Sequence, residues 1–174
     1  MRRTSSFGIT FPKGTAAGLS IQVFADVDTQ PRHLTGGQFR EGLVMCRGAC
    51  VSWCSRTQKY ITLSTTESEY VARADVMKEV LFLKQVRRFM LPAISMSCIP
   101  VFEYNEGAEQ ITQSPITNSN SKHIDERHHF LWELVGRKEI PIRHAPPAFQ
   151  HVDFLTKPIA QEPFEFHRDF VINL

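Results

Sequence analysis

One long helical pattern sets the strongest constraint on how this chain folds. Ser64 followed by Glu67 is a capping-box signature, and neither glycine nor proline follows until Pro92. Apolar residues recur along this run in two adjoining stripes, so the helix is expected to bury a wide face against other elements. The stripes are Tyr70, Ala74, Met77 and Leu81, and Val76, Val80 and Leu83.

Short apolar runs around this helix have the alternation typical of strands. Residues 19–28 alternate, and the apolar runs of 42–55 are separated by Arg47-Gly48, the pattern of a hairpin turn. Pro141 in the last predicted strand lacks an amide donor, which suits a sheet edge. An antiparallel meander followed by crossover strands predicts a mixed sheet with helices on its faces, an α/β domain. Further strands are predicted at 59–63, 98–104 and 139–145, and further helices at 106–113, at 123–138 and at Asp153.

The length and composition fit one domain. A chain of 174 residues with 42% hydrophobic residues can bury one core. We expect this domain over residues 19–160, after a basic connecting segment, 1–18, and before an aromatic-rich tail, 161–174. Residues 29–41 have no helix or strand period and are predicted to form a loop.

The charge and the cysteines limit the classes of protein that fit. A net charge of +2 permits an anionic partner without demanding one. The four cysteines form no CxxC pair and no secretory leader precedes them, so we expect an intracellular protein, cytoplasmic or nuclear. Metal binding by these cysteines is the less favoured alternative to packing in the core. No apolar run approaches the ~18 residues of a membrane span.

Three acidic residues lie at strand ends or helix starts, where α/β domains commonly carry functional residues. The loops at these positions do not have to pack in the core, and the three acids are Asp26, Glu69 and Asp153. Glu69 is in line with one apolar stripe of the long helix, whereas Glu67 is turned away by roughly 200°. Converging carboxylates repel one another, and magnesium ions relieve that repulsion and suit two-metal phosphodiester hydrolysis. The spacing alone favours a simpler alternative, in which these acids form turns or complement a helix dipole and bind no metal.

Three ordered blocks of the sequence carry a family resemblance. They are "VSWCSRTQKYITLSTTESEYVARAD" at 51–75, "NSKHIDERHHFLWELV" at 120–135 and "HVDFLTKPI" at 151–159. These blocks resemble the ribonuclease H domain of copia-type retrotransposon Pol polyproteins, over about residues 4–160. The resemblance implies a five-stranded mixed sheet and magnesium-dependent cleavage of the RNA strand of an RNA–DNA hybrid. It also implies a neighbouring reverse transcriptase portion as a partner.

The resemblance implies catalytic, metal-binding roles for Asp26, Glu69 and Asp153. The third acid of the family stands in "[YF]-x-D-N", where this chain has "FEYN", so Tyr104 replaces it. A neutral phenol is a poor magnesium ligand, and the loss of a direct ligand is expected to cost at least ~10–100-fold in activity. Glu103 points to the opposite face of the strand, which leaves Glu106 as the substitute to consider.

The remaining candidates are weaker. The segment "GGQFREG" stands where the family has "R-[RK]-S-x-S-G", and decay and repurposing both explain this departure. Isolated basic residues are usually solvated, and helical histidines are more often bonded to neighbours than to zinc. The candidates for nucleic-acid contact are Arg56, Lys59 and Lys122, and the histidines considered are His123, His128, His129, His144 and His151.

Two hypotheses follow. The first is a retroelement ribonuclease H whose activity is impaired or lost through Tyr104. The second is a non-catalytic module, derived from a retrotransposon, that keeps the fold to bind nucleic acid or protein.

Overall fold

A computed structural model describes residues 7–11, 20–28, 39–57, 65–93, 98–103, 125–155 and 157–173, apart from the side chains of 65–67, 69, 70, 103 and 125–129. The strands are β1 (Ile21–Asp28), β2 (Phe39–Cys46), β3 (Ala49–Thr57), β4 (Val101–Glu103) and β5 (Ile142–His144). The α-helices are α1 (Thr65–Met90), α3 (Asp125–Gly136) and α4 (Gln161–Ile172), and the 3-10 turns are η1 (Pro147–Phe149) and η2 (Asp153–Leu155).

The five strands form one mixed sheet in the order β3-β2-β1-β4-β5. β1, β2 and β3 are an antiparallel meander, whereas β4 runs parallel to β1 and β5 runs parallel to β4. This arrangement confirms the predicted α/β fold and places β5, directly after Pro141, at a sheet edge. β1 is central, so both of its neighbours can contribute to a site at its carboxyl end.

The turn between β2 and β3 is the one that the sequence predicts. Arg47 and Gly48 both have positive φ angles, 55° and 79°. Two consecutive left-handed residues twist in the sense that suits a two-residue hairpin. The predicted break in the 42–55 segment is therefore confirmed.

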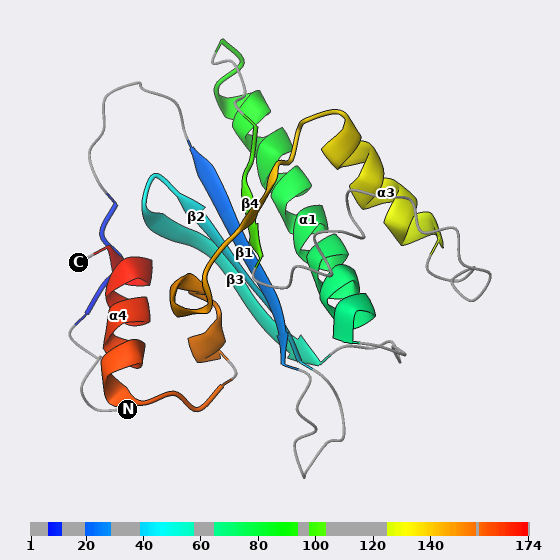
Figure 1. Cartoon of the computed structure of the whole chain (residues 1–174). Helices are drawn as coiled ribbons and strands as arrows, with labels where there is room; N and C mark the ends of the chain where they lie inside the picture. Colours follow the sequence, from blue (N-terminus) through cyan, green and yellow to red (C-terminus); the bar gives the residue numbers. More distant parts are fainter. Residues whose placement is uncertain are drawn as a thin grey trace.

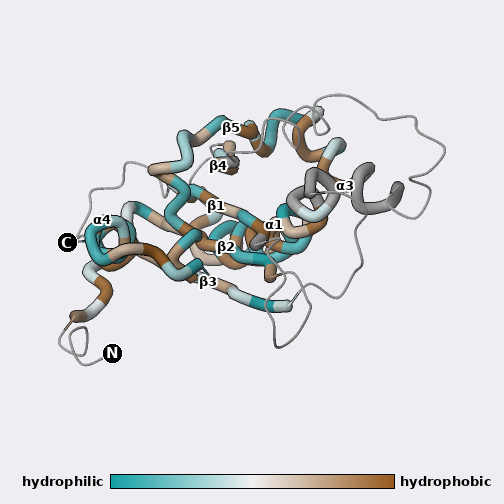
Figure 2. The backbone as a smooth tube through the Cα atoms, turned by 60° about the horizontal axis from the view of Figure 1, so that its bottom comes forward, coloured by the Kyte–Doolittle hydropathy of each residue, from teal (hydrophilic) through white to brown (hydrophobic). Residues whose placement is uncertain are grey.

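Helices cover both faces of the sheet (Figure 1). α1 and α3 lie over one face, and α4 lies with the two 3-10 turns on the other. Alternation along β1 divides the core accordingly: Val23 and Ala25 pack with α1, and Phe24 packs on the α4 side. Figure 2 shows the sheet between these helices, with α4 at one side and α1 and α3 at the other.

Several predicted elements have different bounds in the structure. The predicted loop over 29–41 is wrong at its end, because Phe39–Glu41 pair with β1 and β3 as the start of β2. The sequence analysis did not predict α4, which has an aromatic and polar pattern within the segment taken as a tail. The predicted turn at Asp153 is confirmed as η2. The strand at 59–63 and the helix at 106–113 lie outside the described residues.

No helix in the described part of the chain is both long enough and apolar enough to cross a membrane.

The close packing of α1 against β2 depends on Gly42. A Cβ atom at this position would lie 2.6 Å from Val76 Cγ2 and 3.0 Å from Cys54 Sγ. We therefore expect Gly42→Ala to lower the free energy of unfolding by about 1–3 kcal/mol, through overpacking between α1 and β2. Urea denaturation measures this change.

Gly136 is the matched control, because a Cβ atom there would meet nothing within 4 Å. Gly136→Ala is expected to be neutral or to stabilise by up to about 1 kcal/mol. Equal stability of the two variants would contradict the close approach of α1 to β2.

Candidate metal centre

Asp26 is the central acid of the candidate site. It lies near the carboxyl end of β1, with 0% of its surface exposed. In the register of the sheet, Asp26 is directly opposite Glu41 of β2. Opposite residues of an antiparallel pair place their side chains on the same face. This is the α4 side, because Phe24 and Leu43, two residues along on each strand, pack in the core on that side.

Asp153 approaches the same face from η2. The loop before it is tied to β1, because the Gln150 side-chain amide donates a hydrogen bond of 3.0 Å to the carbonyl oxygen of Ala25. Val152 is fully buried in the core beside Phe24. These contacts hold the turn next to Asp26 although the two acids are far apart in the sequence.

His151 anchors this turn to α4. Its ring stacks on Phe170, with ring centroids 3.5 Å apart, and meets Phe24 edge-on at 5.3 Å. Its Nδ1 lies 3.1 Å from the Nδ1 of His167, so one ring donates the hydrogen bond and the other accepts it. Burial, together with the nearby His167, lowers the pKa of His151 to about 4. Burial also lowers the pKa of His167. Both rings therefore pack as neutral groups near neutral pH, and His151 is a structural residue of the site.

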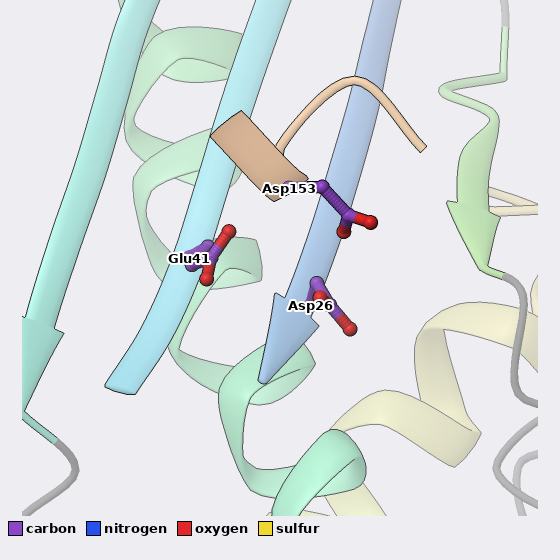
Figure 3. A group of neighbouring side chains, drawn as sticks. All are labelled: Asp26, Glu41 and Asp153. Atoms are coloured by element: carbon purple, nitrogen blue, oxygen red, sulfur yellow. The ribbon is translucent and has the colours of Figure 1, made fainter. Parts of the chain in front are cut away.

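Asp26, Glu41 and Asp153 bring their carboxylates together (Figure 3). Each offers one oxygen, and these oxygens lie within 4.8 Å of one another. Lys157 already places a positive charge among them, because its Nζ lies 2.6 Å from Asp26 Oδ2 and 2.9 Å from Asp153 Oδ1. The cluster therefore holds a cation of its own, a lysine ammonium that bridges two of the three acids.

Burial sets the charge state of this site. Burial raises the pKa of Asp26 to about 7, although the adjacent Lys157 ammonium opposes the shift and the charge of Asp153 adds to it. Burial alone would lower the pKa of Lys157, but the charges and hydrogen bonds of Asp26 and Asp153 together raise it above its ordinary value. The lysine therefore stays charged, while the Asp26 carboxyl group holds its proton more tightly than an exposed carboxyl group.

The donor set fits a hard divalent cation. Asp26 Oδ1 is buried and has no hydrogen-bond partner among the described residues. Carboxylate oxygens are the ligands that magnesium and manganese prefer, and a divalent ion relieves repulsion among them. The residues present therefore offer the oxygen ligands that such an ion requires.

The structure brings two of the three predicted acids together. Asp26 and Asp153 share the site, whereas Glu69 lies near the start of α1 with its side chain outside the described part. Arg56 is exposed on β3, opposite Arg40, and His144 is exposed on β5. The catalytic roles stay predictions. Tyr104, Glu106, Lys59, Lys122 and His123, and the side chains of His128 and His129, lie outside the described residues.

Glu41 is the member of the cluster that the sequence analysis missed. It stood in the segment predicted as a loop, so no strand register was assigned to it. The available signal was an acid directly before the apolar run of 42–46, in the strand that hairpins with 49–57. Extending that run by three residues places Glu41 opposite Asp26.

Comparison with solved structures shows the ribonuclease H fold. RNase H1 of Halobacterium salinarum matches with a TM-score of 0.55 at 17% identity, over 84% of this chain and 98% of that chain. The N-terminal RNase H domain of rv2228c from Mycobacterium tuberculosis matches with a TM-score of 0.54 at 12% identity, over 87% of this chain and 98% of that one. The chain therefore has the α/β fold of these ribonuclease H domains.

Sequence comparison finds relatives among the polyproteins of plant transposons. The chain is similar in sequence to retrovirus-related Pol polyproteins of plant transposons. It is 28% identical over 124 residues to that of transposon TNT 1-94 from Nicotiana tabacum, covering 71% of this chain. It is 29% identical over 167 residues to that of transposon RE2 from Arabidopsis thaliana, covering 93% of this chain. The chain spans about a tenth of these relatives, 9% and 11% of their lengths.

Another relative is not named as a polyprotein. The secreted RxLR effector protein 161 of Plasmopara viticola is 33% identical over 85 residues, which cover 48% of this chain and 57% of the effector. No family model matches the sequence.

The raised pKa of Asp26 predicts a pH-dependent effect of Asp26→Asn. Because the folded-state pKa of about 7 exceeds the ordinary 3.8, the contribution of Asp26 to stability is fully present below about pH 4 and is lost as the pH rises through about 7. Asparagine does not titrate. We expect the free energy of unfolding of Asp26→Asn, relative to the original protein, to increase from about pH 5 to about pH 8 by on the order of 2 kcal/mol.

Urea denaturation in the presence of a chelator measures this difference at both pH values. Glu133→Gln, at an exposed position of α3, is the control and should give a flat difference. A difference for Asp26→Asn that is equally flat would contradict the burial of an ionisable carboxyl group at this position.

Proposed function

We propose that this chain is a retroelement ribonuclease H domain that hydrolyses the RNA strand of an RNA–DNA hybrid with a divalent metal, and that Tyr104 impairs this activity. The observation that carries the proposal is the meeting of Asp26 and Asp153 around a cation within a ribonuclease H fold. One solved structure with this fold, LC11-RNase H1, is a complex with an RNA/DNA hybrid. It matches with a TM-score of 0.54 at 15% identity.

Each residue has a stated task in this proposal. Asp26 and Asp153 would hold the metal, and Glu69, near the start of α1, is the third proposed ligand. A divalent metal held by these residues would supply the activation of water and the stabilisation of the leaving oxygen of the phosphodiester. Lys157 neutralises the two aspartates through its ion pairs with both, and would be displaced from between them by a metal. Magnesium is the expected ion, because it prefers carboxylates and retained waters.

Tyr104 follows directly after the last residue of β4 in the sequence. A phenol in place of a carboxylate removes one ligand and one negative charge, so the metal is held with fewer constraints. Misplacement of the metal by about 1 Å lowers catalysis by roughly 10²-fold. We therefore propose slow cleavage rather than the full rate of a complete four-acid site.

A second candidate function is a non-catalytic binding module. Two observations favour it: the loss of the acid at Tyr104, and a relative that carries the name of a secreted effector rather than of a polyprotein. Such a module binds a hybrid with strong salt dependence and without cleavage. The reverse transcriptase portion of a polyprotein is the proposed partner where the chain belongs to one.

Cleavage of a labelled RNA–DNA hybrid with magnesium or manganese tests these proposals. We expect slow cleavage by the original protein, no cleavage by Asp26→Asn, and an increase of at least ~10-fold in Tyr104→Asp, because the missing ligand is restored. Glu133→Gln, exposed on α3 on the opposite face of the sheet, is the matched control and should not change the rate.

The outcomes separate the two candidates. Salt-dependent hybrid binding without cleavage, in both the original protein and a folded Tyr104→Asp variant, would reject the nuclease and support the binding module. If the Asp26→Asn variant cleaved the hybrid at the original rate, the cleavage would come from a contaminating nuclease or from another site.

A further inference from the structure

We infer that Glu41 is a metal ligand of this site, supplied from β2. This inference rests on the proposed function and deepens it, because it adds a carboxylate that the family blocks of the sequence did not indicate. The stretch containing Glu41 departs from the family pattern, which has serine before the glycine where this chain has Glu41-Gly42.

The position of Glu41 follows from the strand register. Glu41 pairs directly with Asp26 in the antiparallel β1–β2 ladder, so both side chains project from the same face. Glu41 is 0% exposed, and one of its carboxylate oxygens lies within 4.8 Å of oxygens of both Asp26 and Asp153. Figure 3 shows the three side chains converging from β1, from β2 and from the turn at η2.

A second observation indicates that this cluster binds a cation. Asp26 Oδ2 and Asp153 Oδ1 already hold the ammonium of Lys157. Asp26 Oδ1, on a side chain with no exposed surface, has no hydrogen-bond partner among the described residues. A divalent ion that binds this oxygen, together with Glu41 and Asp153, satisfies a buried acceptor that is otherwise costly to leave without a partner.

Glu41 also bears on the role of Tyr104. β2 and β4 flank β1 on opposite sides, so a ligand from β2 approaches Asp26 from the side away from β4. Glu41 would therefore supply a carboxylate to the ion from the β2 side. Metal affinity therefore survives the substitution at Tyr104, while the geometry for cleavage is poorer. The inference therefore predicts metal binding together with slow hydrolysis.

Manganese binding, measured apart from catalysis, tests this inference. Electron paramagnetic resonance counts free Mn²⁺ during titration of the full chain, and thermal unfolding with and without Mn²⁺ reports the same binding through stabilisation of the folded state. The proteins compared are the original chain, Glu41→Gln, Asp26→Asn and Glu79→Gln. Glu79 is the matched control, because it is an exposed glutamate of α1 whose side chain accepts a hydrogen bond from Ser52 rather than joining the cluster.

We expect Glu41→Gln to weaken Mn²⁺ binding by at least ~10-fold and to remove most of the thermal stabilisation by Mn²⁺. Glutamine keeps the size of the side chain but lacks the charge of a carboxylate. Glu79→Gln should bind as the original protein does. If Glu41→Gln does not fold, Mn²⁺ binding is measured on Glu41→Asp instead. Its carboxylate is withdrawn by one methylene group, so affinity should again be lower than in the original protein.

Each adverse result has a separate meaning. Mn²⁺ affinity that is unchanged in Glu41→Gln, or in Glu41→Asp where only that variant folds, but lost in Asp26→Asn would overturn the role of Glu41 and leave the proposed function standing. No Mn²⁺ binding by the original protein at millimolar concentrations would overturn both.

Discussion

The burial of Asp26 on the central strand of the sheet is the constraint on which the rest of the site depends. A carboxylate without solvent contact costs several kcal/mol unless positive charge is near it. Here Lys157 supplies that charge and joins Asp26 to Asp153. The segment from η2 to the start of α4 is therefore held on the sheet by an ion pair as well as by apolar contacts. An acid at this position is costly for folding, which is typical of positions kept for chemistry.

The fold provides the geometry at this point through two independent supports. The register of β1 with β2 places Glu41 beside Asp26, and the Gln150 amide ties the loop before Asp153 to the carbonyl oxygen next to Asp26. Behind this loop, His151 packs between Phe24 and α4 as a neutral ring. The positions of the three carboxylates are thus fixed by rigid elements, and the histidine and phenylalanine contacts join the turn that carries Asp153 to α4.

Much of the architecture is predictable from the sequence because it depends on local patterns. The long helix, the turn at Arg47-Gly48 and the mixed sheet follow from periodicity and turn chemistry, and the structure confirms them. Asp26 and Asp153 could be named from their positions at element ends. Glu41 could not, because its role depends on a register between strands that periodicity does not fix. Lys157 was missed for a related reason: its partner Asp26 is 131 residues away in the sequence.

The most direct test of this account is the anomalous diffraction of crystals soaked in Mn²⁺. The account predicts a peak at about 2.0–2.6 Å from carboxylate oxygens of Asp26, Asp153 and Glu41, the range of ligand distances for hard divalent ions. The released Lys157 ammonium should then lie beside the metal rather than between the two aspartates. A map with no peak at this cluster, and with Lys157 still bridging Asp26 and Asp153 at saturating Mn²⁺, would contradict the account.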